Sequence, residues 1–159
     1  MAKAPDKTNV MRLLEQSGIP YTPHYYDPEL TVGETVAETL GIPRECVFKT
    51  LVTEGADRGH YVFVIPVAET LDLKKAARAA GVKSVAMLRQ KELLPLTGYI
   101  HGGCSPIGMK KPFPTFVDET ALLTDRFCCS AGRVGAQIEL SADALAEYIG
   151  AEFEDLTEG

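Results

Sequence analysis

Residues 46–67, CVFKTLVTEGADRGHYVFVIPV, constrain the fold of this chain more than any other stretch. Two runs rich in β-branched and aromatic residues flank a connection that contains glycine and aspartate, which is the pattern of a β-hairpin. Helical and further strand-like segments lie on both sides of this hairpin along the chain, so hairpins are mixed with helical crossovers. The sequence therefore predicts an α+β or mixed α/β fold, with a single largely antiparallel mixed sheet and packed helices.

The remaining elements follow from the spacing of apolar residues and from the turn residues between them. Helices are predicted at residues 6–18, 31–41, 71–81 and 141–150, with one helical turn at 89–96. Ser141 is the predicted N-cap of the last helix. Short strands are predicted at residues 20–27, 83–88, 114–118, 125–132 and 136–141. No repeat or internal linker interrupts these elements, so residues 1–159 are expected to form a single domain.

The formal net charge of the chain is −6, and 45% of its residues are apolar. Tight nonspecific binding to a nucleic-acid backbone requires a basic face, so any contact with nucleic acid is expected to be local, small or assisted by a partner. No apolar run approaches the ~20 residues of a membrane span, and the N-terminus lacks the apolar core of a signal peptide. We expect a cytoplasmic protein with reduced cysteines and no membrane partner.

Lys49 is the first residue that could carry chemistry. In a strand it lies on the same face as Val47 and Leu51. A covered ammonium group is costly unless it meets an anion or loses its proton. A lysine near a strand end can instead extend its amine into water. The residues alone leave both interpretations open.

Residues 97–111, TGYIHGGCSPIGMKK, hold more glycine, proline and small polar residues than a turn needs. Gly102, Gly103 and Gly108 permit positive φ angles and the close approach of a ligand to the main chain. Consecutive amides in such a loop bind anions, and Ser105 adds a hydroxyl. An irregular connection between strands explains the same residues, and the spacings of a P-loop and of a dinucleotide-binding motif are both absent.

A second turn of small residues, SAGRVG at 130–135, joins two predicted strands. A β-turn accounts for this composition by itself. Two such turns in one short domain could also form two walls of a single pocket.

Cys104 lies within the first of these turns and could act as a nucleophile, because loop amides could lower the pKa of its thiol. His101 is its candidate partner, by proximity in the sequence. His101 and Cys104 also have the spacing of half a metal site, but no second half with matching spacing is present, so no metal is expected. Tyr25 and Tyr26 are most simply explained as half-buried strand aromatics.

Four motifs occur in order over most of the chain: VFKTL, LDLKKAARAAGVKSVAM, TGYIHGGCSPIGMKK and SAGRVG. Together they resemble the YbaK type of trans-editing aminoacyl-tRNA deacylase. These bacterial Cys-tRNA(Pro) deacylases are related to the editing domain of prolyl-tRNA synthetases. The resemblance implies an enzyme that removes cysteine mistakenly attached to proline tRNA, with correctly charged cysteine tRNA as a further substrate.

The resemblance assigns catalysis to Lys49 and implies that the loop amides hold the ester carbonyl or the terminal ribose. It implies a substrate-binding set of Tyr26, Thr50, Gly102, Gly103, Ser105, Pro106, Gly108, Ser130 and Gly132. The implied partners are the acceptor end of tRNA and prolyl-tRNA synthetase, which would supply most of the tRNA recognition. Neither a cofactor nor a DNA partner is implied.

The resemblance also points to substrate-assisted chemistry, in which the thiol of the cysteinyl ester attacks its own carbonyl and releases a thiolactone. Three departures concern the amino-acid preference and the binding of the tRNA end. Family members often have an aliphatic residue in place of Cys104 and a second basic residue within 130–135, and some have aspartate in place of Gln137. Three alternatives stay open: a module that binds aminoacyl-tRNA or a nucleotide without turnover, a deacylase for another small amino acid, and a thiol enzyme that uses Cys104.

Overall fold

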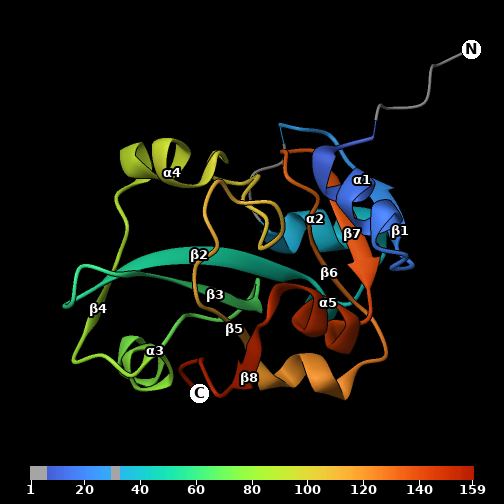
Figure 1. Ribbon diagram of the computed structural model, residues 1–159. Helices are drawn as coiled ribbons and strands as arrows, with labels where there is room; N and C mark the ends of the chain where they lie inside the picture. Colours follow the sequence, from blue (N-terminus) through green and yellow to red (C-terminus); the bar gives the residue numbers. More distant parts are fainter. Residues whose placement is uncertain (1–6, 30–32) are drawn as a thin grey trace, which may run out of the picture.

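The strands form two sheets in the computed structural model, which describes residues 7–29 and 33–159 (Figure 1). The large sheet has the strand order β4-β2-β3-β5-β8, and the small sheet has the order β1-β7-β6. The strands are β1 (Thr22–Tyr25), β2 (Phe48–Gly55), β3 (His60–Pro66), β4 (Val85–Met87), β5 (Thr115–Asp118), β6 (Phe127–Ser130), β7 (Ala136–Leu140) and β8 (Glu152–Glu154). The helices are α1 (Asn9–Gln16), α2 (Gly33–Leu40), α3 (Leu73–Ala80), α4 (Gln90–Thr97) and α5 (Ala142–Ile149), with 3-10 turns η1 (Arg44–Cys46) and η2 (Glu119–Leu123).

The α+β class and the largely antiparallel pairing are confirmed. Both pairs of the small sheet are antiparallel, as are β2–β3 and β2–β4 in the large sheet. The pairs β3–β5 and β5–β8 are parallel, because each is joined by a long crossover that contains helix. The sequence pattern does not predict β8, which is only three residues long.

The structure differs from the expectation of a single sheet, and the outer edge of β2 is the reason. At one end of this edge residues 53–55 pair with β4. At the other end Val47, just before β2, forms an isolated parallel bridge to Cys128 of β6. Between these two contacts, no strand in the described part of the chain pairs with residues 48–51 on this edge. The hydrogen-bonded ladder is interrupted there, and the strands divide into two sheets.

Capping residues set the ends of the helices. Ser141 is the N-cap of α5, as predicted, and its hydroxyl accepts a hydrogen bond from the first turn of the helix. Asp72 caps α3 in the same way, and Gly81 ends that helix with a φ of +73°. The helix predicted at residues 31–41 is present as α2, although residues 31 and 32 lie outside the described part of the chain.

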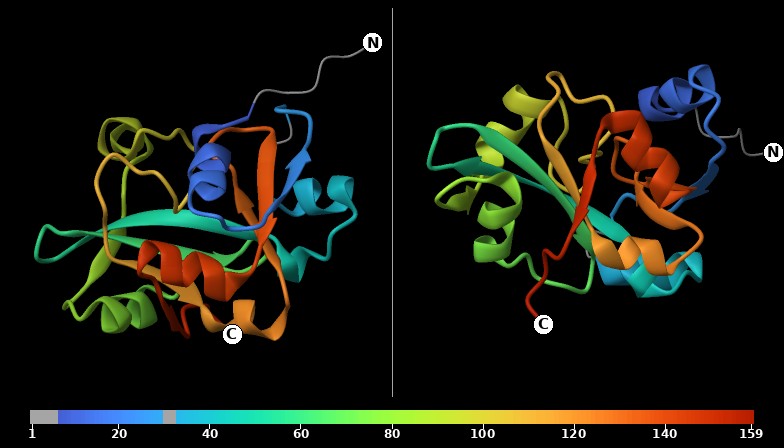
Figure 2. Two further views of the ribbon diagram at one scale, coloured as in Figure 1. Left: turned by 45° about the vertical axis from the view of Figure 1, so that its right-hand side comes forward. Right: turned by 60° about the horizontal axis from the view of Figure 1, so that its bottom comes forward.

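Two apolar clusters hold the sheets and helices together. The larger cluster lies between the small sheet, α1 and α5, and in it Phe48 of β2 packs edge to face on Phe127 of β6, with ring centroids 5.1 Å apart. This contact joins the two sheets. The second cluster packs α3 against the other face of the large sheet, and in the right-hand view of Figure 2 strands of this sheet lie between α3 and α5. None of the described helices is long and apolar enough to span a membrane.

Candidate functional site

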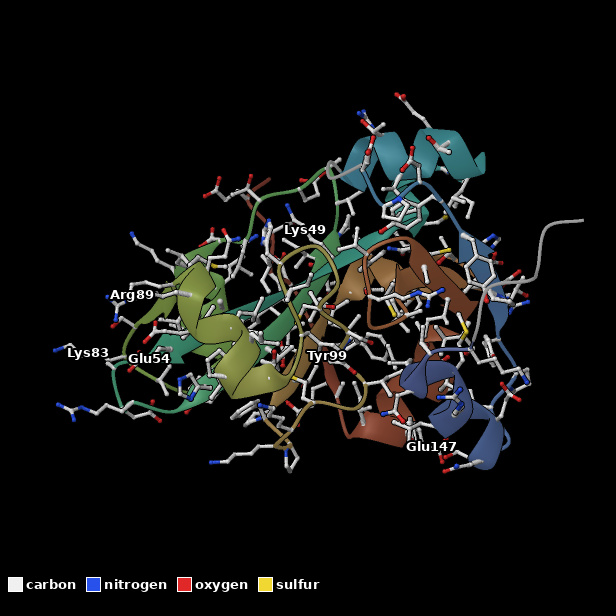
Figure 3. The ribbon with its side chains drawn as sticks, turned by 90° about the horizontal axis from the view of Figure 1, so that it is seen from above. Lys49, Glu54, Lys83, Arg89, Tyr99 and Glu147 are labelled. Carbon is white, nitrogen blue, oxygen red and sulfur yellow. The ribbon has the colours of Figure 1, made fainter. Side chains whose placement is uncertain are left out.

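The two sheets meet where residues 47–50 run beside residues 128–130, a contact that we term the seam. Val47 and Cys128 form the parallel bridge of the seam, and both pack in one apolar cluster with α2. If this parallel register continued by two positions, Lys49 would lie level with Ser130 and on the same face, although the hydrogen-bonded ladder is already interrupted there. Lys49 is half-buried and Ser130 is buried. Figure 3 shows Lys49 on β2, away from the hairpin end that is marked by Glu54.

A row of polar side chains continues from Lys49 across the small sheet. Ser130 pairs with Gln137, and Gln137 pairs in turn with His24. Directly paired residues project from the same face of a sheet. We term Lys49, Ser130, Gln137 and His24 the polar row. The row brings together residues from four strands.

Two buried oxygen atoms near the seam have no hydrogen-bond partner among the described residues, namely Thr50 Oγ1 and Gln137 Oε1. Gln137 belongs to the polar row. Thr50 follows Lys49 directly and therefore projects from the opposite face of β2. Native proteins leave few buried polar atoms unpaired, and a bound ligand is one kind of group that satisfies them. One unpaired oxygen therefore lies in the seam, at Thr50, and the other lies next to it in the polar row, at Gln137.

The two glycine-rich turns lie directly against each other. A Cβ atom on Gly103 would come within 2.9 Å of the backbone nitrogen of Val134 and 3.0 Å of the carbonyl carbon of Arg133. Only glycine allows this approach, so Gly103 is explained by contact between the two turns. Gly102 has a φ of +86° and is exposed, so its backbone is accessible to a ligand.

Tyr99 holds the two turns in place, a role that the sequence analysis missed. Its hydroxyl donates a hydrogen bond to the carbonyl of Ile107. Its ring lies next to Gly108 and Gly132, one from each turn. Burial raises the pKa of Tyr99 to about 12, which keeps the hydroxyl protonated as a donor. In Figure 3 the labelled ring lies among the side chains at the centre of the view.

The residues of the first turn differ in their exposure. Gly102 and Gly108 are exposed, whereas Ser105 and Pro106 are buried. The Ser105 hydroxyl accepts a hydrogen bond from the Ile107 N–H at 3.3 Å, within the turn itself. Ser105 and Pro106 therefore contribute to the shape of the turn in this conformation.

Tyr26 and Gly132 are tied to the second turn by backbone hydrogen bonds. Tyr26, directly after β1, donates from its backbone N–H to the carbonyl of Gly135 at 3.0 Å. Gly132 donates from its N–H to the Ser130 hydroxyl at 3.1 Å. These bonds bring Tyr26, Ser130 and Gly132 to the same turn.

The alternative in which loop amides lower the pKa of Cys104 is not supported. Cys104 packs with Val52 and Val62 in an apolar cluster, and this burial raises the pKa of its thiol to about 12. An uncharged thiol at neutral pH is a poor nucleophile. His101 is exposed whereas Cys104 is buried, so these two residues do not present a joint pair of metal ligands.

Two cavities lie elsewhere on the molecule. One, of about 490 Å³, is bordered by α4 and includes His60, Leu88 and Leu96. The other, of about 200 Å³, lies beside α3 and includes Lys75 and Glu154. Neither is lined by a predicted site residue, so the candidate site rests on the geometry of the seam.

Sequence comparisons link the chain to proteins that edit aminoacyl-tRNA. A model of the family described as aminoacyl-tRNA editing domain matches residues 27–148. The chain is 46% identical over 157 residues to EbsC of Enterococcus faecalis, named as a Cys-tRNA(Pro)/Cys-tRNA(Cys) deacylase, and the match covers 98% of this chain and 96% of EbsC. The proline–tRNA ligase of Cupriavidus taiwanensis is 29% identical over 109 residues, which are 67% of this chain but 19% of the ligase.

Two solved structures share the fold over most of their length. One is described as a trans-editing enzyme for prolyl tRNA synthetase, and it matches with a TM-score of 0.85 and 28% identity over 94% of this chain and 95% of its own. The other, the hypothetical protein APE2540, matches with a TM-score of 0.86 and 27% identity over 94% of this chain and 99% of its own.

Proposed function

The chain belongs to the aminoacyl-tRNA editing domain family, and from that premise we propose that it is a trans-editing deacylase that removes cysteine from Cys-tRNA(Pro) and Cys-tRNA(Cys). The 46% identity to EbsC extends over nearly the whole of both chains, which supports the same reaction and substrate class. Within this chain, the proposal is supported by three neighbouring contacts: the edge of β2 meets β6 just before Lys49, Ser130 of β6 pairs with Gln137, and the turn that follows Ser130 packs against the first glycine turn.

Lys49 is the catalytic residue of the proposal. A half-buried ammonium group is less screened than one in water, so it interacts strongly with an anion or a developing negative charge. Its proposed partners are the terminal phosphate or ribose of the tRNA, or the amino-acid part of the ester. Ser130 and the unpaired oxygen of Gln137 lie in the same row and supply further hydrogen-bonding groups.

The two turns hold the adenosine end of the tRNA in this proposal. Gly102 and Gly108 are exposed and free of side chains, so the nucleotide can lie against the main chain. Tyr26, Thr50 and Gly132 complete the proposed binding surface. Gly103, Ser105 and Pro106 act by keeping the first turn in shape.

The substrate supplies its own nucleophile. The cysteinyl thiol attacks the ester carbonyl, a C–S bond forms, the C–O bond to the ribose breaks, and the proton of the thiol passes to the ribose oxygen. The products are a cyclic thiolactone and free tRNA, and water later opens the ring. This reaction needs orientation more than an enzyme base, which agrees with a site built from a lysine and backbone donors. The raised pKa of Cys104 disfavours that residue as a rival nucleophile.

Prolyl-tRNA synthetase is the proposed protein partner. The net charge of −6 disfavours strong independent binding to a tRNA backbone. The similarity to a segment of proline–tRNA ligases supports a role beside that enzyme. Addition of the synthetase should therefore lower the KM for Cys-tRNA(Pro) more than it lowers the KM for Cys-tRNA(Cys).

Incubation of purified protein with preformed Cys-tRNA(Pro), Ser-tRNA(Pro) and Ala-tRNA(Pro) tests the proposal. We expect release of cysteine with a thiolactone intermediate, and much slower release of serine, because a hydroxyl is the weaker nucleophile. Binding of the tRNA without release of cysteine, at an excess of protein, would identify a binding module and overturn the proposal. Comparable rates for the serine ester would exclude the substrate-assisted step, and preferential release of alanine would identify a deacylase for another small amino acid.

A further inference from the structure

A second cluster of reactive side chains lies on the same face of the small sheet as the polar row. The ligand atoms of His24, Cys128 and Glu139 all lie within 4.8 Å of one another. The three residues come from β1, β6 and β7. Among the described residues, this is the one group of three His, Cys, Asp or Glu side chains whose possible ligand atoms lie close enough together to share a metal ion.

The register of the small sheet explains why these side chains meet. Glu139 of the central strand β7 is paired directly with Cys128 of β6. On the other side Glu139 is paired with Thr22, and His24 lies two positions further along β1, so it reaches Glu139 diagonally. The His24 Nε2 and Glu139 Oε1 atoms are 2.7 Å apart.

Outer contacts orient the carboxylate of Glu139. The Arg126 Nε atom lies 3.7 Å from Glu139 Oε2, and the Arg126 guanidinium also donates to the Glu139 backbone carbonyl at 2.7 Å. One carboxylate oxygen therefore faces Arg126, and the other faces His24 and Cys128. Such second contacts fix the orientation of a metal-binding side chain.

The cluster is open to solvent on one side and closed on the other. The side chains of His24 and Glu139 are 23% and 29% exposed, whereas Cys128 is fully buried. An ion can therefore reach the cluster from solvent and contact the sulfur at its base.

We propose that His24, Cys128 and Glu139 bind a zinc ion. Nitrogen, thiolate sulfur and carboxylate oxygen are the zinc ligands of proteins, whereas Mg²⁺ and Ca²⁺ prefer sites made only of oxygen. Bond lengths of about 2.0 to 2.3 Å in a tetrahedral site place ligand atoms about 3.3 to 3.6 Å apart, so small side-chain movements suffice. Three protein ligands leave the fourth position to a solvent molecule.

Two protons must leave the ligand atoms when the metal binds. The Cys128 thiol releases its proton to solvent and binds as the thiolate. The proton in the hydrogen bond between His24 Nε2 and Glu139 leaves Nε2, to Nδ1 or to solvent, so that Nε2 can bind the metal. Burial raises the pKa of Cys128 to about 12, so the thiolate forms only when a cation offsets its charge. Zinc binding is expected to cross-link β1, β7 and β6, which are already hydrogen-bonded to one another, through their side chains. The inference does not depend on deacylase activity.

Cobalt substitution tests the site directly. Metal-free protein is titrated with Co²⁺, whose thiolate complexes show a near-ultraviolet charge-transfer band and whose tetrahedral complexes show intense visible bands. We expect one equivalent to bind with both features and to be displaced by Zn²⁺. A wild-type protein that shows no charge-transfer band at saturating Co²⁺ would overturn the proposal.

Adjacent cysteines provide a matched pair of variants. Cys128 faces the cluster and its neighbour Cys129 faces the core, so Cys128→Ala should abolish the charge-transfer band whereas Cys129→Ala should keep it. His24→Ala should weaken binding and the exposed His101→Ala should not. Zn²⁺ should also raise the Tm of the wild type but not of Cys128→Ala, because a ligand stabilises only a fold that binds it. A band that persists in Cys128→Ala would refute the assignment.

Discussion

The two faces of the small sheet are built from alternate residues of the same strands, yet they have opposite properties. On the inner face Phe127, Cys129 and Ile138 are fully buried in one apolar cluster. On the outer face Cys128 packs with Val47 but also lies close to His24 and Glu139, and Gln137 keeps an unpaired oxygen. A β-strand alternates its side chains, so each step along β6 or β7 changes from one environment to the other.

The comparison separates residues that stabilise the fold from residues that are proposed to bind a ligand. The inner face is filled by closely packed apolar side chains. The outer face contains the polar row and the His24–Cys128–Glu139 cluster, and the seam adds Lys49 to it. We therefore expect neighbouring residues in sequence to respond oppositely to substitution, in the free energy of unfolding on one face and in activity or ligand binding on the other.

The largest expected effect is the loss of packing on the inner face. Ile138→Ala removes a fully buried side chain, and it should lower the free energy of unfolding by about 2 to 5 kcal/mol, because the cavity left behind is only partly filled. The remaining folded protein should keep its kcat/KM for Cys-tRNA(Pro). Denaturant unfolding gives the first quantity, and activity per folded molecule gives the second. A variant that is stable but inactive would break the comparison.

Lys49→Ala is expected to have the largest effect on activity. If the ammonium acts in the transition state, kcat/KM should fall by about 10² or more. The fold should persist, since a half-buried lysine contributes little to the apolar core. Deacylation kinetics and far-UV circular dichroism measure the two effects. Near-normal turnover in the variant would remove Lys49 from the site.

Gln137 sharpens the comparison because it directly precedes Ile138. Gln137→Leu keeps a similar volume and removes the unpaired oxygen, so stability should be unchanged or slightly raised. Activity should fall by about tenfold if the amide contacts the substrate through one hydrogen bond. Gln137→Asp, which keeps an oxygen acceptor at this position, should keep more activity than Gln137→Leu and serves as the control. If Gln137→Leu turns over normally, the amide has no part in binding.

Cys104→Ala should have the smallest effect. Its thiol is buried among apolar side chains and has a raised pKa, so it resembles an inner-face residue despite its place in the first glycine turn. The variant should keep most of its activity, measured on Cys-tRNA(Pro) at neutral pH. An inactive variant, together with an acyl-enzyme detected by mass spectrometry in the wild type, would restore Cys104 as a nucleophile.

Much of the candidate site could be predicted because its motifs are local. Glycine and proline clusters mark the two turns, and alternation places Lys49 in a strand. Tyr99 was missed, since a tyrosine before a turn gives no sign that it will contact both turns. The cluster of His24, Cys128 and Glu139 has no local sequence pattern either, because His24 and Glu139 are separated by 115 positions and meet only through strand register.

By itself the sequence determined the elements: the hairpin of β2 and β3, the capped helices and the turns between them. These depend on residues within one or two turns of each other, where periodicity and backbone preferences act. Only the tertiary structure decided that the strands divide at the edge of β2, that Val47 lies opposite Cys128, and that three distant side chains form a cluster. Strand register depends on packing between segments far apart in the chain, and a shift of one residue would turn every side chain to the other face.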